Sequence, residues 1–238
     1  MPLIAIVTFV TAILTLLTGF GLGTVLTPVF TIFYDVKLAV LMVAIVHLLN
    51  NLFKLYLFRA HVDLGIVRRF GVLSIVEAFV GAMLQASVSS GPLKAFLGLA
   101  FLLLGAVEFL PSGKRPTLPK KVDVIGGFAS GLLGGLIGNQ GAIRSAYLLN
   151  YQITKEQFIA TATVIASVID LTRIPLYLVS YHEQLLTRWT DIVPVLAVAY
   201  CGTLVGTQLL KFVDLGTFKK GVAACVVLLG VGLVLGLI

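Results

Sequence analysis

The sequence predicts an all-α polytopic integral membrane protein built from two homologous halves. Apolar residues make up 59% of the chain and charged residues 11%, compared with roughly 45–50% and about 25% in soluble domains. Apolar segments recur along the whole length, and the polar segments between them are too short to form a domain outside the membrane. The design of the first half recurs in the second, so we expect an internal repeat.

The first apolar segment predicts a broken or re-entrant helix. It precedes Asp35, the first charged residue, and is interrupted by the glycines of Gly19–Thr24 and by Pro28. One membrane-spanning helix needs about 20 residues and two need about 40, and this segment fits neither length. Glycine-rich backbone inside a membrane must be buried in protein or line a wet cavity, because lipid cannot hydrogen-bond to it. Interrupted helices of this kind are typical of transport sites.

The second half has the same design. Gly134–Gly141 corresponds to Gly19–Thr24, and Arg144 is the only charged residue between Asp123 and Lys155. Each broken helix is expected to be followed by three transmembrane helices. The predicted parts of the chain are a first repeat at 1–110, a cytoplasmic linker at 111–121 and a second repeat at 122–238.

The last two helices of each repeat are expected from long apolar runs. They are Val67–Val88 and Pro92–Leu110 in the first half, and Trp189–Leu210 and Leu215–Leu237 in the second.

The charges of the loops predict that the two repeats are inverted in the membrane. If each broken segment returns to the side from which it enters, Lys37, Lys94 and Arg188 lie on one side and the other loop lysines and arginines lie on the opposite side. Cytoplasmic loops carry the excess of Lys and Arg. Full crossings of both broken segments would divide these charges almost evenly. The inverted arrangement is therefore favoured, with both termini outside.

Two helices carry polar residues at membrane depth, each set on one helical face. The first set is His47, Asn50, Asn51 and Lys54. The second set is Thr163, Ser167, Asp170 and Arg173. A charge in the bilayer core costs at least about 2.5–3.5 kcal/mol, so these groups are expected to face protein or water and to line an access path or join the repeats. The alternative is that Lys54 and Arg173 extend to the headgroups from near their helix ends.

The second break predicts an anion-binding site. Arg144 follows it closely, and a half-helix that begins at a glycine-rich break exposes free backbone N–H groups at its positive end. An arginine adds a planar set of donors to these amides. The expected donors are Gly21, Gly23, Thr24, Asn139, Gln140 and Gly141, with Arg144 as the countercharge. The alternative is that the glycines only permit close helix packing, as expected for Gly81, Gly206 and Gly230.

A carboxylate in the third helix is the candidate for ion coupling. Glu77 lies near the middle of an apolar segment, where it could carry a coupling proton or neutralise a buried cation. His47 could titrate near neutral pH or serve as a hydrogen-bonded core residue. A proton and a sodium ion are both candidate coupling ions.

Other functional classes find no support in the sequence. There is no HExxH motif, no metal-binding arrangement of Cys and His, and no nucleotide-binding or ATPase motif. We therefore expect no enzymatic activity and no cofactor. The net charge of +7 lies in short loops, which is typical of membrane topology signals and not of a nucleic-acid partner. Cys201 and Cys225 lie in apolar stretches and are expected to be packing residues.

Three segments resemble the TauE/SafE sulfite exporter family. Gly21–Pro28 (GLGTVLTP) is similar to its first glycine motif and Gly131–Gly141 (GLLGGLIGNQG) to its second, and Arg59–Asp63 (RAHVD) looks like the basic loop after the second helix. Ser145 lies where the family usually has a proline. The resemblance implies a multi-pass protein of the bacterial inner membrane that exports small sulfur-containing anions such as sulfite or organosulfonates.

The residues and the resemblance together predict a secondary transporter that binds a small anion between the two helix breaks. An anion channel or uniporter would use the same residues without alternating access. A membrane scaffold subunit without a substrate is the alternative from another class.

Overall fold

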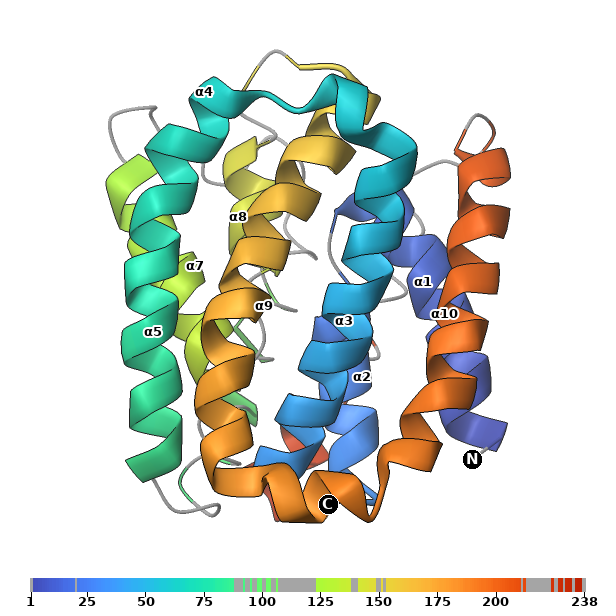
Figure 1. Ribbon diagram of the computed structural model, residues 1–238, viewed down its shortest axis with the longest axis vertical. Coiled ribbons are helices and arrows are strands. Elements are labelled where there is room, and N and C mark those ends of the chain that lie inside the picture. Colours follow the sequence, from blue (N-terminus) through green and yellow to red (C-terminus); the bar gives the residue numbers. More distant parts are fainter. Residues whose placement is uncertain are drawn as a thin grey trace.

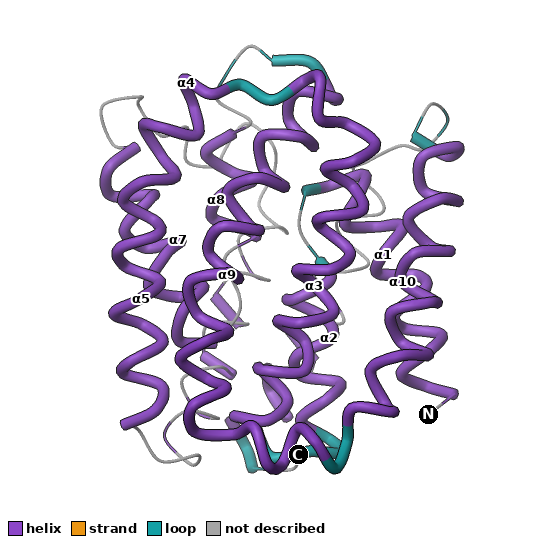
Figure 2. The backbone as a smooth tube through the Cα atoms, in the orientation of Figure 1, coloured by secondary structure: helices purple, strands orange, loops and turns teal. Residues whose placement is uncertain are grey.

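A computed structural model describes most of the chain. The described residues are 2–19, 21–87, 123–137, 141–148, 151 and 153–210, with isolated positions at 92, 95, 98–99, 102–103, 106, 212, 224, 227–228, 230–232 and 234–236. They form helices joined by loops and turns, with no strand among them (Figure 2). The predicted linker 111–121 and most of the predicted helices Pro92–Leu110 and Leu215–Leu237 lie outside the described residues.

The all-helical prediction is confirmed. The elements are α1 (Pro2–Thr18), α2 (Leu22–Thr31), α3 (Val36–Phe58), η1 (Arg59–His61), α4 (Leu64–Ile66), the π-helical turn η2 (Val67–Gly71), α5 (Val72–Ser87), α7 (Asp123–Ile137), α8 (Gly141–Leu148), α9 (Lys155–Leu186) and α10 (Trp189–Leu209). Within the described part of the chain, three helical segments are long and apolar enough to cross a membrane: Val36–His61, Lys155–Leu186 and Trp189–Leu209.

The first predicted helix break is present, because α1 ends at Thr18 and α2 begins at Leu22. The second predicted break falls on residues 138–140, which lie outside the described residues, between α7 (Asp123–Ile137) and α8 (Gly141–Leu148). At the first break Gly19 has a φ of 74° and Gly21 a φ of 138°, values that favour glycine because a side chain would strain the backbone. A helix rises about 1.5 Å per residue, so neither 10-residue α2 nor 8-residue α8 can cross a bilayer of about 30 Å.

Local sequence explains where the long helices begin. The Asp35 carboxylate accepts a hydrogen bond from the Lys37 amide at 2.9 Å and caps α3. Thr154 and Gln157 form a reciprocal capping box at the start of α9, with hydrogen bonds of 3.0 and 3.2 Å. The long helix that follows each pair of short helices therefore has a capped start in both halves of the chain.

The helices lie in two layers. In Figure 1, α5, α9, α3 and α10 stand side by side, and α7, α8, α2 and α1 lie behind them. α3 begins at the lower edge of the view, where α2 ends, and α9 begins at the upper edge and runs in the opposite direction. The two pairs of short helices therefore lie within the back layer and are covered by long helices.

Apolar side chains divide between a core and an outer surface. Leu26, Phe30 and Met42 pack in a buried cluster between α1, α2, α3 and α10. Val76 and Val179, in contrast, are exposed on the outside of α5 and α9. Exposed apolar side chains on apolar helices fit a surface that faces lipid.

Glycines bring α5 and α7 into close contact. A Cβ at Gly81 would lie 2.5 Å from the Leu132 carbonyl oxygen, and Cβ atoms at Gly131 and Gly135 would collide with the backbone of α5 at Ser74 and Ala78. The expected packing role of Gly81 is therefore supported. Small residues allow helix backbones to approach in membranes, where the hydrophobic effect does not drive helix association.

Replacing Gly135 by alanine is expected to destabilise the fold by about 1–3 kcal/mol, because the backbone of α5 must move to admit the methyl group. The measurement is thermal unfolding of the detergent-solubilised protein. Gly65→Ala is the matched control, since a Cβ there would meet only side-chain atoms, of Asp63 at 3.1 Å and Arg69 at 3.7 Å, and no backbone of another helix. Equal melting temperatures for the two variants would contradict the close-packing explanation.

Candidate functional site

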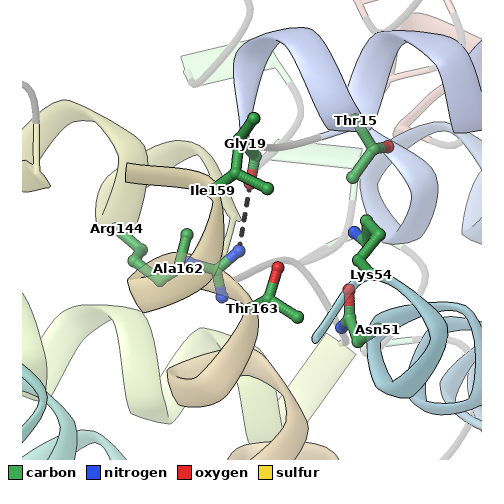
Figure 3. Close-up of a pocket in the computed structure, with 8 residues that line it drawn as sticks. All are labelled: Thr15, Gly19, Asn51, Lys54, Arg144, Ile159, Ala162 and Thr163. Atoms are coloured by element: carbon green, nitrogen blue, oxygen red, sulfur yellow. Dashed lines mark hydrogen bonds between the residues drawn. The ribbon is translucent and has the colours of Figure 1, made fainter. Parts of the chain in front are cut away.

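A small cavity lies where the first break, α3, α8 and α9 meet. Its lining is shown in Figure 3 and consists of Thr15, Gly19, Asn51, Lys54, Arg144, Ile159, Ala162 and Thr163. The cavity volume is ≈ 10 Å³, about the space that one water molecule needs. The lining joins residues from both halves of the chain.

Arg144 supplies fixed positive charge from α8. Its side chain is 2% exposed, and Nη2 donates a hydrogen bond to the Gly19 carbonyl oxygen at 3.1 Å. Nε and Nη1 have no hydrogen-bond partner among the described residues. A buried guanidinium normally satisfies its donors, because leaving them unpaired costs free energy. Within the described residues, this arginine is therefore held by one hydrogen bond, and its Nε and Nη1 remain available as donors.

Lys54 lies opposite Arg144. It comes from α3, is 3% exposed, and its amine points into the cavity in Figure 3. The described lining contains these two cations and no carboxylate. Two buried cations that face one small space create a positive potential there, since the low local dielectric screens them poorly. The arrangement favours an anion between them.

Thr15 fixes the geometry of the first break. Its hydroxyl donates to the Thr11 carbonyl oxygen at 2.7 Å and accepts from the Leu22 amide at 2.6 Å. One side chain therefore joins the end of α1 to the start of α2. The Gly19 amide continues α1 by donating to the Thr15 carbonyl oxygen at 2.9 Å, which leaves the Gly19 carbonyl to meet Arg144.

A buried charge network lies beside the cavity. The Asp170 carboxylate contacts His47 Nδ1 at 2.7 Å through Oδ2, and its Oδ1 accepts from Arg173 Nε at 3.0 Å and Nη2 at 2.8 Å. Arg173 Nη1 also donates to the Gly134 carbonyl oxygen at 2.9 Å. Since His47 is on α3 and Gly134 on α7, the network joins three helices.

Two further buried hydrogen bonds join helices near this network. The Tyr177 hydroxyl donates to the Gly135 carbonyl oxygen on α7. The Thr203 hydroxyl donates to Asn50 Oδ1 at 2.8 Å and joins α10 to α3. The three side chains and the carbonyl in these two bonds belong to segments that are expected to cross or enter the membrane, where polar groups need partners within the protein.

The predicted polar residues are brought together. Asn51, Lys54, Arg144 and Thr163 line the cavity. The other five residues of the two predicted polar stripes are buried: His47, Asn50, Ser167, Asp170 and Arg173. The alternative that Lys54 and Arg173 extend to the headgroups is wrong, because they are only 3% and 0% exposed. Both point inward because α3 and α9 pack against one another along this face.

Other predicted residues do not line the cavity in this structure. Gly21, Gly23 and Thr24 are buried at the start of α2, where the Leu22 amide is already bonded to Thr15. Gly141 is the buried first residue of α8, and Asn139 and Gln140 lie outside the described residues. Glu77 is half-buried on α5 and is absent from the lining.

The sequence alone did not predict that Thr15, Gly19, Ile159 and Ala162 line the cavity. A signal for Thr15 exists, because Thr8, Thr11 and Thr15 recur on one face of α1 and are all buried. Ile159 lies one turn before Thr163 on α9, and Ala162 directly precedes Thr163. Apolar residues here carry no chemical signal of their own. Their role as walls is visible only once the helices are packed.

Comparison with known proteins identifies the family. A family model described as sulfite exporter TauE/SafE matches residues 4–233, which is nearly the whole chain. No curated protein and no solved structure matches the sequence. The match, together with the apolar membrane-length helices, supports a multi-pass membrane protein without enzymatic activity. The chain therefore belongs to the TauE/SafE sulfite exporter family of membrane transporters of sulfur anions.

Proposed function

We propose that the protein is a secondary transporter that exports a small sulfur-containing anion, sulfite or a related organosulfonate, across the bacterial inner membrane. The anion binds in the cavity between the two helix breaks, near the middle of the bilayer. Arg144 and Lys54 are its countercharges, and Asn51 and Thr163 are the neutral polar groups beside it.

The observation that carries this proposal is that Arg144 is buried and lacks hydrogen-bond partners for two of its nitrogens among the described residues. Its guanidinium is 2% exposed, contacts the Gly19 carbonyl across the first break, and leaves Nε and Nη1 without partners in the described part of the chain. Nε shares one edge of the planar guanidinium with Nη2, and Nη1 shares the other edge with Nη2, so the two nitrogens offer hydrogen-bond donors in different directions. An oxyanion oxygen on either edge can accept such a charge-assisted hydrogen bond. An anion would supply the partners that the protein leaves out.

The second break can add backbone donors to the same anion. Gly141 begins α8 three residues before Arg144, and the first amides of a helix have no partner within it. Asn139 and Gln140 of the preceding segment are further candidate donors. Gly21, Gly23 and Thr24 at the start of α2 are assigned a supporting role, in which they shape the first break.

The dimensions of the cavity favour a carrier over an open pore. A space of ≈ 10 Å³ fits about one water molecule, whereas an oxyanion has several heavy atoms. Binding then requires the walls to move apart, as the broken helices of alternating-access transporters do. The membrane potential, negative inside, assists expulsion of an anion by about 2.3 kcal/mol per charge per 100 mV.

The test is counterflow in proteoliposomes. Vesicles loaded with unlabelled sulfite are diluted into a trace of radiolabelled sulfite, and a carrier is expected to accumulate label transiently by exchange. Label that equilibrates at once, without overshoot or saturation, would support the channel alternative. No protein-dependent flux and no sulfite binding would support the scaffold alternative.

We further propose that residues 1–110 and 122–238 are inverted repeats joined by the linker 111–121, with both termini outside. The opposite directions of α3 and α9, each preceded by a short broken-helix pair, support this arrangement. Single cysteines at the exposed positions Ala60 and Thr187, in a background without Cys201 and Cys225, test it. Labelling of Ala60→Cys only from inside and Thr187→Cys only from outside is expected. Labelling of both from one side would contradict the proposal.

A further inference from the structure

The contact between His47 and Asp170 is chemically connected to the anion cavity through Asn51. The Asn51 nitrogen Nδ2 lies 3.2 Å from Nδ1 and 3.3 Å from Nε2 of the His47 ring. Asn51 also lines the cavity beside Lys54, and in Figure 3 its side-chain oxygen is turned toward the cavity. That oxygen has no hydrogen-bond partner in the described part of the chain. One amide thus contacts the histidine at one end and the cavity at the other.

With Asp170 ionised, its contact with Nδ1 sets the tautomer of a neutral His47 ring. Nδ1 lies 2.7 Å from the Asp170 carboxylate, which can only accept when ionised, so Nδ1 carries a hydrogen and donates it. Nε2 of a neutral ring is then an acceptor, and it takes its hydrogen bond from the Asn51 NH₂ group. The amide oxygen is left facing the cavity. An acceptor in that position repels an anion.

A proton added to Nε2 reverses this arrangement. The ring then has N–H donors on both nitrogens, so it needs an acceptor where the Asn51 NH₂ group lay. A half-turn of the amide presents its oxygen to Nε2–H and its NH₂ group to the cavity. The protonated ring also brings a positive charge close to the cavity. Both changes favour a bound anion, and by reciprocity a bound anion favours the proton.

The surroundings of His47 contain few other titratable groups. α9 contributes Asp170 and Arg173, and α3 itself contributes Lys54. α1 and α2 carry no titratable residue. On α10 the titratable residues are Asp191, Tyr200 and Cys201; Asp191 bonds to Tyr34, and Tyr200 donates to the Leu49 carbonyl oxygen. Lys54 and Arg173 oppose a proton on His47 while the cavity is empty, and an anion beside Lys54 offsets that repulsion.

We propose that His47 Nε2 is a proton-binding site and that Asn51 couples it to the anion cavity, so that one proton moves with each anion in the same direction. The proton comes from the aqueous phase that delivers the anion and leaves with the anion on the other side. A monoanion and its proton then cross without net charge, so the concentration gradient of the anion drives their export, and the membrane potential assists only the charge of an anion that the proton does not cancel. The inference rests on the proposed function, since it requires an anion in this cavity.

The experiment counts protons taken up when the purified protein binds an anion, by calorimetry in buffers of different ionisation enthalpy. Methanesulfonate is the probe, because it stays ionised and takes up no proton itself; sulfite is measured in parallel. About one proton per anion is expected at a pH where empty His47 is neutral, and affinity is expected to fall about tenfold per pH unit there. His47→Gln is expected to take up none and to bind with little pH dependence.

The controls separate the possible causes. Tyr200→Phe removes another hydrogen bond to α3 and is expected to behave like the wild type. Proton uptake that persists in His47→Gln would assign the proton to another group, such as Lys54, and overturn the proposal. Asn51→Leu keeps both cations but removes the acceptor for Nε2–H, so its proton uptake is expected to fall below half; unchanged uptake would overturn the role of Asn51.

Measurements on the wild-type protein alone also test the proposal, even if a variant fails to fold. Saturable binding of an anion without proton uptake would overturn this inference and leave the proposed function intact. Absence of saturable binding of both methanesulfonate and sulfite would remove the proposed function, and this inference with it.

Discussion

Arg144→Ala is expected to abolish sulfite counterflow in proteoliposomes. The substitution removes the guanidinium whose Nε and Nη1 have no partner within the described protein, and with it the main countercharge of the anion. Removing one member of a buried, hydrogen-bonded charge pair weakens binding by about 2–5 kcal/mol, or roughly 30- to 5,000-fold. Arg144→Lys keeps the charge but loses the planar fork, so an intermediate loss is expected.

The stability of Arg144→Ala is expected to distinguish a binding residue from a structural one. Among the described residues the buried arginine makes one hydrogen bond, to the Gly19 carbonyl, and no ion pair, so its charge costs free energy. Its removal is therefore expected to leave the melting temperature unchanged or higher. Arg68→Ala, at an exposed position of η2, is the control and should retain counterflow. Normal sulfite flux through correctly folded Arg144→Ala would falsify the assigned role.

Asp170→Asn is expected to cause the largest loss of stability. The carboxylate accepts two hydrogen bonds from Arg173 and contacts His47, and both Asp170 and Arg173 are 0% exposed. An amide cannot neutralise Arg173, so its charge remains buried without a counterion. Breaking a buried ion pair from one side costs about 3–5 kcal/mol. Thermal unfolding in detergent and the yield of folded protein measure this effect.

A second substitution tests the origin of that loss. Arg173→Met in the Asp170→Asn background removes the unpaired charge, so part of the lost stability is expected to return, because a buried pair can often be replaced by apolar groups at little net cost. Asp191→Asn is the matched control: it alters the hydrogen bond with Tyr34 at a partly exposed position and should cost about 1 kcal/mol or less. Equal effects of Asp170→Asn and Asp191→Asn would contradict a buried network at Asp170.

The sequence predicts a large part of the fold, because membrane residence imposes strict rules on it. The apolar composition and the length of the first segment suffice to predict an all-helical protein with a helix broken near Gly19, since lipid tolerates neither unpaired backbone nor long polar segments. The inward stripes that contain Asn51 and Asp170 also follow from helical spacing and the cost of charge in a membrane.

The tertiary structure decides which of these polar groups are satisfied. Spacing along the chain places Lys54, Asp170 and Arg173 on two stripes, but only packing shows that Asp170 takes Arg173 and His47 and leaves Lys54 beside the cavity. It likewise turns a carbonyl, that of Gly19, toward Arg144 where amide donors were expected. Pairing between residues distant in sequence depends on the rotation and depth of each helix, and these are fixed by contacts such as Gly135 against Ala78, which leave no periodic signal in the chain.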